Sequence, residues 1–366
     1  MSGENGNRIK TRFFRVSEET FDAVINEAAE IINTGGTVAF PTETVYGLGA
    51  DGLNPEAVRK IFEAKGRPPG NPLSLLVHSR EDVEKVAKNI PEKAFKLMDT
   101  FWPGPLTIVL DKKDEVPGIT SGNLPSIGVR MPDHRIPLEL IKRIGTPLAA
   151  PSANLSGKPS PSLATHVEAD LTGRIDAIID GGEAAIGLES TVIDMTVEPP
   201  AVLRPGAIGI EELEKAIGKV RSGYKDNKTS DIDEQLDKLA GQKYGHYTPD
   251  TKVVLVEGES KFVSEKIAEL LVDYGNRGEK AGLLLSEEIA GLINASGLNA
   301  DYCFLLGSRE EPELAAKKLY EGLRKLDGKG LDVIVADGSF SRSGLGDALI
   351  NRLREASSDR YLRGLQ

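Results

Sequence analysis

The stretch "KIFEAKGRPPGNPLSLLVHS", residues 60–79, joins a helical pattern to an apolar strand through a loop that is stiffened by proline. The helix that we expect over residues 55–65 has one apolar stripe, and Lys65 occupies the next position on that stripe. Gly66 is a natural residue to end this helix. Two cations, Lys65 and Arg67, therefore stand at a rigid helix-to-strand junction, and residues 64–79 contain no carboxylate to pair with them.

These two cations have two interpretations. An interaction with the dipole at the C-terminus of the helix explains Lys65, but it explains neither Arg67 nor the rigid loop. Two cations that are fixed on a stiff loop are what a polyphosphate ligand needs. The local sequence leaves a helix-end contact and a phosphate site equally open.

Short apolar runs between turn residues surround this stretch from residue 12 to about residue 217, and they predict strands of four to six residues. Helical patterns at 17–32, 55–65, 91–99, 136–143 and 210–217 interrupt them irregularly. We therefore expect an α/β domain with a mixed, twisted sheet. The runs are "TVAFPT", "LSLLVH", "LTIVLD", "IGVRMP", "TPLAAPS", "DAIIDGG", "STVIDM" and "AVLRPG".

The pattern changes twice further along the chain. Residues 218–250 are rich in charge and poor in large aliphatic side chains, which predicts a linker, although its end "GHYTPD" is unusual for a passive spacer. After residue 251 the runs "KVVLVE", "AGLLLS", "YCFLLG" and "LDVIVAD" have the composition of buried strands and alternate with helical patterns. This alternation predicts a small, doubly wound parallel sheet of Rossmann-like type. We therefore divide the chain into 1–217, 218–250 and 251–366.

Length and composition narrow the class of protein. A chain of 366 residues favours two domains. The net charge of −11 argues against broad nucleic-acid binding but is compatible with one basic cleft. The lone Cys303 excludes an internal disulfide framework and a cysteine-based zinc site, and the four histidines lack metal-binding spacing. The first residues are polar, and no apolar run approaches the ~18 residues of a membrane span, so we expect a cytoplasmic protein without a structural metal.

One motif has the glycine spacing of a dinucleotide-binding site but lacks its structural context. The segment "GLGADG", residues 47–52, matches the dinucleotide fingerprint GxGxxG. The fingerprint requires its glycines to open a helix, whereas Asn54 and Pro55 form a helix cap of their own. No acidic residue follows about 20 positions later. We interpret these glycines as tight-turn residues, and the chain has no Walker A sequence.

Polar residues gather where several predicted strands end. The segment "APSANLSGKPSPS", residues 150–162, places small hydroxyl and amide side chains after a strand, which favours a ligand loop, although an ordinary turn is equally compatible. Arg130 follows an apolar strand and needs a partner for its charge. Other residues at strand ends are individually more typical of structure than of function: Thr42, Thr44, His78, Ser126, Ser190 and Arg204.

Taken together, five segments resemble the YrdC-like domain family over residues 15–217: "GGTVAFPTETVYGLGADG", "KIFEAKGRPPGNPLSLLVHS", "APSANLSGKPSPS", "LESTVID" and "LRPGAI". The family signature, a Lys-x-Arg pair with a Ser-x-Asn triplet, corresponds to Lys65–Arg67 and Ser152–Asn154. The linker "HYTP" and the segment "SGLGDALINRLREAS" resemble the two-domain form found in the threonylcarbamoyl-AMP synthase family.

This resemblance implies a fold and a reaction. The fold would be an open, twisted α/β sheet with a concave, locally positive cleft. The activity would be that of a nucleotidyltransferase that forms L-threonylcarbamoyladenylate and pyrophosphate from ATP, L-threonine and bicarbonate. The product would pass to the tRNA threonylcarbamoyl transferase machinery, which makes threonylcarbamoyladenosine. Mg²⁺ would sit on the ATP phosphates and not in a protein cage, and neither a membrane nor DNA would be a partner.

The resemblance also assigns residues to the two substrates. This sequence departs from the commonest pattern of the family at two positions. Ser126 stands where threonine is frequent, and Thr248 stands where alanine is frequent. Phosphoryl chemistry depends on positioning and charge neutralisation more than on a strong base, which suits these residue types. Catalysis would involve Lys65, Arg67, Ser152 and Asn154. ATP would contact Lys65, Arg67, Asn71, Ser126, Ser152, Asn154, Ser160, Arg204 and the lid residue Tyr247. L-Threonine would contact Thr44, His78, Arg130, the backbone of Ala150, and Ser190.

Three other functions share part of this sequence pattern. A non-catalytic, RNA-binding YrdC-like module is the alternative, and the net charge weakens it. A carbamoyltransferase of hydrogenase maturation would need an acylphosphatase domain and CxxC zinc fingers, which the length and the single cysteine exclude. A regulator with a ligand in the C-terminal domain lacks a specific motif, because "LGSREEP" and "DGSFSRSG" have the pattern of ordinary strand-to-helix turns. The oligomeric state and the role of the C-terminal domain stay open.

Overall fold

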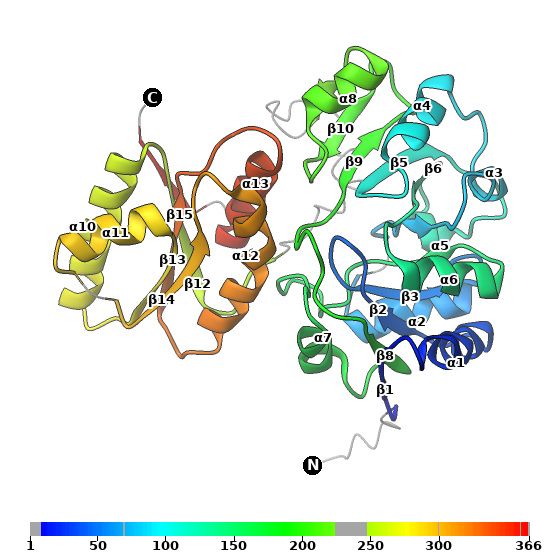
Figure 1. Cartoon of the computed structure of the whole chain (residues 1–366), viewed down its shortest axis with the longest axis horizontal. Helices are drawn as coiled ribbons and strands as arrows, with labels where there is room; N and C mark the ends of the chain where they lie inside the picture. Colours follow the sequence, from blue (N-terminus) through cyan, green and yellow to red (C-terminus); the bar gives the residue numbers. More distant parts are fainter. Residues whose placement is uncertain (1–8, 69, 224–246, 299, 359, 365–366) are drawn as a thin grey trace.

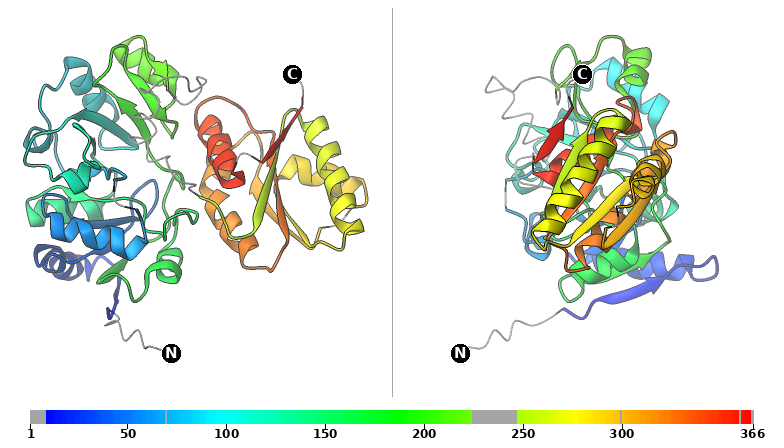
Figure 2. Two further views of the ribbon diagram at one scale, coloured as in Figure 1. Left: turned by 180° about the vertical axis from the view of Figure 1, so that it is seen from behind. Right: turned by 90° about the vertical axis from the view of Figure 1, so that its left-hand side faces the viewer.

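A computed structural model of the chain describes residues 9–68, 70–223, 247–298, 300–358 and 360–364. Two α/β bodies lie side by side in it (Figure 1), and Figure 2 shows the same division from behind and from one end. Most of the linker that was predicted at 218–250, including His246, lies outside the described residues. None of the helices in the described ranges combines the length and the apolar character that a membrane crossing requires.

The first body is built on a large mixed sheet with strand order β1-β8-β2-β3-β7-β4-β6-β5-β9-β10-β11. It contains parallel pairs, such as β5 with β9, and antiparallel pairs, such as β5 with β6, which confirms the mixed sheet predicted from the irregular alternation. The strands are β1 (Arg12–Arg15), β2 (Val38–Phe40), β3 (Gly47–Asp51), β4 (Leu75–Leu76), β5 (Leu106–Asp111), β6 (Ser126–Arg130), β7 (Leu148–Ala149), β8 (Ala177–Asp180), β9 (Thr191–Asp194), β10 (Ala201–Arg204) and β11 (Arg221–Ser222).

Helices cover this sheet and form two cores. One core joins α1 and α6 to β2 and β8, and it includes Ile25, Leu140 and Ile179. The larger core gathers α2, α4, α7 and α8 with the remaining central strands. The helices of this body are α1 (Phe21–Asn33), α2 (Pro55–Lys65), α3 (Val83–Val86), α4 (Glu92–Phe101), α5 (Gly118–Ser121), α6 (Arg135–Ile144), α7 (Ala164–Leu171) and α8 (Ile210–Ile217).

Helix α2 forms where the sequence predicts it. The Asn54 side chain accepts hydrogen bonds from the backbone N–H groups of Glu56 and Ala57, at 3.0 and 3.3 Å, and so caps the first turn. Gly66 ends the helix in the left-handed region, with φ of 60°. The chain thus turns sharply after Lys65 and carries Arg67 toward the next strand.

The interpretation of "GLGADG" as a tight turn is wrong. Residues 47–51 form strand β3, which pairs with β2 in antiparallel fashion. Gly49 is needed because the buried ring of Phe40 lies against this strand: a Cβ atom on Gly49 would stand 2.4 Å from Phe40 Cε1. Glycine clusters are typical of turns, and only the neighbouring strand explains Gly49 here.

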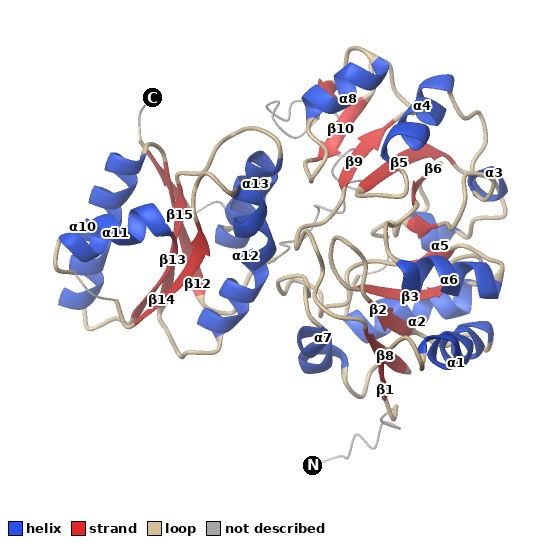
Figure 3. Cartoon of the chain, viewed as in Figure 1, coloured by secondary structure: helices blue, strands red, loops and turns tan. Residues whose placement is uncertain are grey.

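The second body is a parallel, doubly wound sheet with strand order β14-β13-β15-β12-β16. Helices α10 and α11 lie on one face, and α12 and α13 lie on the other (Figure 3). This confirms the predicted Rossmann-like architecture. The elements are β12 (Lys252–Glu257), α10 (Ser260–Asn276), β13 (Ala281–Ser286), α11 (Glu287–Ala295), β14 (Tyr302–Gly307), α12 (Pro312–Asp327), β15 (Val333–Gly338), α13 (Leu345–Ser357) and β16 (Tyr361–Arg363).

One detail of that prediction is wrong. The run "YCFLLG" was expected to be buried, but Tyr302, Cys303 and Leu305 are exposed. Strand β14 lies at the edge of the sheet and pairs only with β13, so part of its apolar surface meets solvent.

The two bodies share an apolar core. Helices α12 and α13 face the first body (Figure 1), and Val45 and Leu188 of the first body belong to the same buried cluster as Leu319 and Leu349. Strand β11 pairs with β10 and so extends the first sheet past residue 217, where the linker was predicted to begin.

Substitution of Gly49 tests the close approach of β3 to Phe40. We expect Gly49→Ala to lower the free energy of unfolding by ~1–3 kcal/mol, because the new methyl group overpacks a buried ring. Gly291→Ala in the exposed part of α11 is the matched control, since a Cβ there meets nothing within 4 Å. It should raise stability by up to ~1 kcal/mol. Urea unfolding of both variants measures the difference, and equal midpoints would contradict this packing.

Candidate functional site

A cleft lies between the strand ends of the first body and the C-terminal body. It encloses about 950 Å³, with the space open to solvent included. Its walls come from the loop after β2, the segment between α2 and β4, the ends of β6, β7 and β10, and the start of β9. Tyr247 at the end of the linker and Glu355 on α13 complete the lining.

The cleft brings together many of the residues predicted from the sequence, drawn from both the ATP set and the threonine set. Other predicted residues do not line it. Those in the lining are Thr44, Arg67, Arg130, Ala150, Ser152, Ser190, Arg204 and Tyr247. Those outside the lining are Lys65, Asn71, His78, Ser126, Asn154 and Ser160.

Arg67 is a cation of the cleft with a lowered pKa and an N–H group that is unsatisfied within the described ranges. Burial lowers the pKa of its guanidinium to about 10, and the nearby Arg204 contributes in the same direction. Its Nη2 donates to Pro72 O at 3.3 Å, and its Nε has no hydrogen-bond partner among the described residues. A buried guanidinium with an unsatisfied N–H group can bind a phosphate or carboxylate oxygen.

Arg204 and Ser190 form a second polar wall. The Nε and Nη2 atoms of Arg204 donate to Ser190 O at 3.1 and 3.0 Å, and Nη2 also donates to Ser190 Oγ at 3.1 Å. The Ser190 hydroxyl shares a further 2.8 Å hydrogen bond with Thr107 Oγ1. Arg204 and Ser190 therefore hold each other at the same edge of the cleft.

Arg130 has the partner that its position demands. Its Nη2 lies 2.7 Å from the Glu43 carboxylate, and its Nε donates to Gly104 O at 3.2 Å. Both members of this ion pair are buried. Beside them, the hydroxyls of Thr42 and Thr44 share a hydrogen bond of 2.8 Å. This end of the cleft offers hydroxyl groups and one neutralised cation, whereas the Arg67 end offers a cation without an acidic partner in the described ranges.

Lys65 lies behind the cleft wall. Its ammonium group donates to the backbone carbonyls of Ser152 and Asn154, at 2.5 and 2.6 Å. Burial, followed by repulsion from Arg67, lowers the pKa of Lys65 well below its usual value. The Asn154 side chain closes the same loop, because its Nδ2 donates to the carbonyls of Leu155 and Lys158 at 2.8 Å each. Lys65 and Asn154 thus shape the loop that presents Ser152.

Asn71 and His78 occupy the segment that leads into and out of β4. Asn71 is buried, and its amide nitrogen has no hydrogen-bond partner in the described part of the chain. The His78 imidazole is paired with the Asp82 carboxylate.

Ser126 and Ser160 are buried at two other places. Ser126 begins β6, whereas Arg130 ends that strand at the cleft. Ser160 lies beside Glu189 and helps to lower the pKa of that carboxyl group.

Glu189 is a cleft residue that was not predicted. Its carboxylate accepts hydrogen bonds from Arg352 Nε at 2.8 Å and from the Tyr320 hydroxyl at 2.8 Å. Burial alone would raise its pKa, but Arg352 and Arg204 lower it below the usual value. The one signal in the sequence was an acidic residue two positions before β9, where a buried charge needs a partner.

The C-terminal body also positions Tyr247. The ring of Tyr247 stacks on Tyr320 with centroids 5.3 Å apart, and the Arg352 guanidinium lies 5.4 Å from its centre. The backbone N–H of Thr248 donates to Gly157 O at 2.8 Å. Glu189, Arg352, Tyr320 and Tyr247 form one buried group, which we call the interdomain cluster.

The chemistry of the cleft follows from its donors. Guanidinium, hydroxyl and backbone N–H groups are suited to anionic oxygens, and they can neutralise charge that develops on a phosphoryl group. Within the described ranges, no group of three or more His, Cys, Asp and Glu side chains is arranged to hold a metal ion.

Comparisons with known families cover nearly the whole chain. Residues 30–206 match a family described as "Telomere recombination". Residues 208–358 match one described as "Threonylcarbamoyl-AMP synthase, C-terminal domain".

Individual relatives align with nearly the whole of this chain. The threonylcarbamoyl-AMP synthase of Pyrococcus abyssi is 47% identical over 356 residues, which are 96% of this chain and 99% of the relative. That of Bacillus subtilis is 43% identical, with 97% of this chain and 100% of the relative covered. The crystal structure of P. abyssi Sua5 complexed with L-threonine matches with a TM-score of 0.87 and 45% identity, and the match covers 97% of this chain and 99% of that one.

Because Arg352 holds the interdomain cluster together, we expect its replacement to destabilise the protein strongly. Arg352→Leu leaves the Glu189 carboxylate buried without its cation, and we expect the free energy of unfolding to fall by ~3–5 kcal/mol. Lys317→Ala is the control, because it removes the more exposed interdomain ion pair with Glu183 and should cost less than ~1 kcal/mol. Urea unfolding compares the two, and similar costs would contradict a special role for the cluster.

His166 predicts a loss of stability in acid. Burial, followed by repulsion from Arg324, lowers its pKa to about 4 from the ordinary 6.5. As the pH falls, His166 therefore takes up its proton in the unfolded chain before it does so in the folded chain. His166 does not lower the free energy of unfolding above pH 6.5, but it lowers this free energy progressively as the pH falls from 6.5 toward 4.

The variant His166→Gln isolates this contribution, because glutamine does not titrate. We expect its unfolding free energy to depend less steeply on pH than that of the wild type between pH 6.5 and 4. Parallel pH profiles for the two proteins would show that the imidazole titrates freely in the folded state.

Proposed function

The chain belongs to the threonylcarbamoyl-AMP synthase family, and we propose that it forms threonylcarbamoyl-AMP and pyrophosphate from ATP, L-threonine and bicarbonate in the cleft between its two bodies. It is an enzyme of the nucleotidyltransferase type. The observation in the cleft that supports this function best is Arg67, a half-buried residue whose buried Nε has no hydrogen-bond partner among the described residues.

The Arg67 side of the cleft would bind ATP. Arg67 and Arg204 would neutralise the triphosphate, and the hydroxyl of Ser152 would contact the α-phosphate region. Lys65 would act mainly by fixing the loop that carries Ser152, since its ammonium group already binds two carbonyls of that loop. The remaining residues proposed on the ATP side are Asn71, Ser126, Asn154, Ser160 and the lid residue Tyr247.

The Arg130 side would bind threonine. The substrate carboxylate would approach the N–H groups of Arg130 that Glu43 leaves available, and the substrate hydroxyl would approach Thr44. Ser190 and the backbone of Ala150 line the same region, and His78 is proposed as an outer contact. The related P. abyssi protein has been crystallised with L-threonine.

The reaction would have two steps. The threonine amine would attack the carbon of bicarbonate, releasing water and giving an N-carboxylate. An oxygen of this N-carboxylate would then attack the α-phosphorus of ATP, and the bond to the β-phosphate would break with release of pyrophosphate. The pyrophosphate would carry the negative charge that Arg67 and Arg204 neutralise.

A magnesium ion fits this cleft as a companion of ATP. The cleft presents guanidinium and hydroxyl groups, and the carboxylate of Glu189 is engaged by Arg352 and Tyr320, so the phosphates would be the main metal ligands. When bound, Mg²⁺ supplies charge neutralisation on the phosphates. We further propose that the reaction takes place in the cytoplasm and that the product is handed to the tRNA threonylcarbamoyl transferase machinery.

Omission of each substrate in turn tests the function. We expect pyrophosphate release only when ATP, threonine and bicarbonate are all present with the purified chain. Release without threonine would overturn the assignment of substrate. If no mixture turns over and a filter assay shows tRNA binding without ATP, the non-catalytic RNA-binding module becomes the better account.

Among single substitutions in the cleft, we expect replacement of Arg67 to cause the largest loss of activity. We expect Arg67→Ala to slow pyrophosphate release by ~100-fold or more, because one preorganised donor to the phosphates is lost. Arg59→Ala is the matched control, since Arg59 is exposed on α2 and is paired with Glu56. Turnover of Arg67→Ala within a few-fold of the control, with both proteins folded by circular dichroism, would remove Arg67 from the mechanism.

A further inference from the structure

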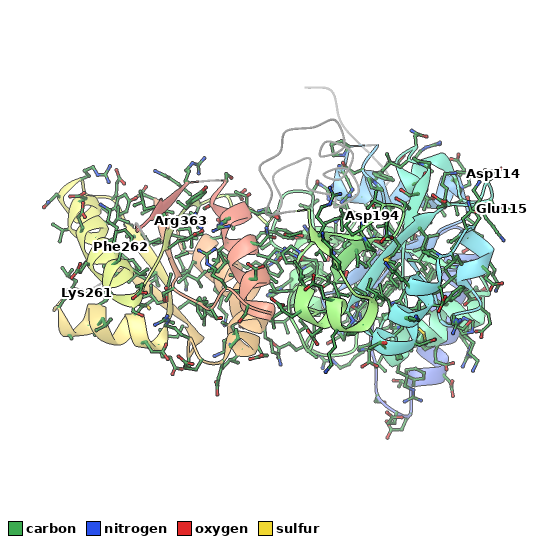
Figure 4. All side chains as sticks on the ribbon, turned by 90° about the horizontal axis from the view of Figure 1, so that it is seen from above. Asp114, Glu115, Asp194, Lys261, Phe262 and Arg363 are labelled. Carbon is green, nitrogen blue, oxygen red and sulfur yellow. The ribbon has the colours of Figure 1, made fainter. Side chains whose placement is uncertain are left out.

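A second hollow lies in the C-terminal body, outside the cleft. It opens at the C-terminal ends of the strands of the parallel sheet and encloses about 1920 Å³, with open solvent space included. Its walls are the segments 258–262 after β12 and 338–342 after β15, together with Arg309 after β14 and Gly364 after β16. Figure 4 shows Lys261, Phe262 and Arg363 in this body, on the side away from the first body.

The topology of the sheet singles out this place. Strands β12 and β15 are neighbours, but the chain leaves them in opposite directions. From β12 it crosses by α10 to β13, and from β15 it crosses by α13 to β16 on the other side and over the opposite face. In open parallel sheets, a crevice forms where neighbouring connections diverge, and ligands bind in such crevices.

Ser339 carries an unsatisfied hydroxyl at this crevice. Ser339 is one of the residues that line the hollow, it is 4% exposed, and its buried Oγ has no hydrogen-bond partner among the described residues. The backbone of Ser339 is fixed, because its N–H donates to Asp337 and its carbonyl accepts from Arg309 at 3.0 and 2.6 Å. A buried hydroxyl without a partner costs free energy unless a ligand or water satisfies it.

Arg309 stands beside it. The backbone N–H of Arg309 donates to the Glu288 carboxylate at 3.0 Å, so its charge lies near one acidic side chain. Its guanidinium donates only to neutral oxygens, the Ser339 carbonyl and the Ser260 hydroxyl, in the part of the chain that the structure describes. Below the hollow, the buried Glu257 carboxylate is shared by three arginines, with N–O distances of 2.6 Å to Arg342, 2.5 Å to Arg354 and 3.5 Å to Arg363. Three arginines therefore surround the Glu257 carboxylate, while the second buried carboxylate, Asp337, accepts from Ser339 N and Ser286.

Helix α10 adds its N-terminus. The helix spans 17 residues, and its N-cap Glu259 makes no side-chain capping hydrogen bond. The first-turn N–H groups are thus free of a side-chain cap and can receive an anion. Glu259, Glu265 and Glu310 are exposed at the rim, where they would repel a bare polyphosphate but could accept hydrogen bonds from sugar hydroxyls.

We propose that the C-terminal body holds a second ligand site, for a nucleoside phosphate, in the crevice between the ends of β12 and β15. The phosphate binds Ser339 and Arg309 at the first turn of α10, and the sugar lies toward the acidic rim. The segments "LGSREEP" and "DGSFSRSG", which have the pattern of ordinary turns, supply Arg309 and Ser339. The site is separate from the cleft and does not depend on the proposed reaction.

Equilibrium binding of AMP to the full-length chain tests the proposal. We expect two AMP molecules per wild-type chain and one per chain in Arg309→Gln, whose remaining site is the cleft. The affinity of the second site should fall about tenfold or more in this variant, because a charge-assisted hydrogen bond is lost. Pyrophosphate release with ATP, threonine and bicarbonate should stay at the wild-type level in Arg309→Gln, which separates this site from the cleft.

Two further variants and one probe complete the test. Lys261→Glu, at an exposed position on α10, should also weaken the second site, whereas Lys252→Glu, with the same change of charge at the opposite end of β12, should not. One AMP molecule per wild-type chain whose binding Arg309→Gln leaves unchanged, or unchanged binding in both Arg309→Gln and Lys261→Glu, would overturn the proposal. Inorganic phosphate that binds the second site as tightly as AMP would contradict the nucleoside part of it.

Discussion

The fully buried ammonium group of Lys65 is the contact on which the cleft depends. It ties the end of α2 to the loop after β7 through the carbonyls of Ser152 and Asn154. A buried cation needs such acceptors, because an unpaired charge would destabilise the fold. The same contact fixes the next residues of the chain, so Arg67 emerges at the cleft opposite Ser152. The two hydrogen bonds of one side chain thus join the end of α2 to the loop after β7, the two segments that define the phosphate end of the cleft.

The interdomain cluster extends this arrangement to the second body. Glu189 precedes Ser190 at the cleft, and its carboxylate is held by Arg352 and Tyr320 from α13 and α12. Tyr247 stacks on Tyr320 within the same cluster. The C-terminal body therefore positions both the start of β9 and the end of the linker, and this gives it a structural role at the cleft in addition to any ligand of its own. Since both charges are buried, loss of Arg352 or Glu189 alone would leave the other as an unpaired charge inside the protein.

Local signals in the sequence predicted much of the fold. The cap at Asn54, the stop at Gly66 and the regular alternation after residue 251 depend on neighbours along the chain, and they gave α2 and the parallel sheet correctly. Long-range contacts were not accessible in this way. Gly49 of β3 is explained by the ring of Phe40 on the paired strand β2, and Arg352, a partner of Glu189, lies 163 residues away. The candidate cleft residues came mainly from resemblance to a family, whereas the direct role of Lys65 as a loop anchor required the structure.

The central claim is that one cleft joins threonine, the carbon of bicarbonate and the adenylyl group of ATP. Mass spectrometry of the product formed with isotope-labelled bicarbonate tests this claim most directly. The account predicts an adenylate that carries threonine and the labelled carbon, formed in step with pyrophosphate. An adenylate that contains threonine without the labelled carbon, or pyrophosphate release without any threonine-containing product, would contradict it.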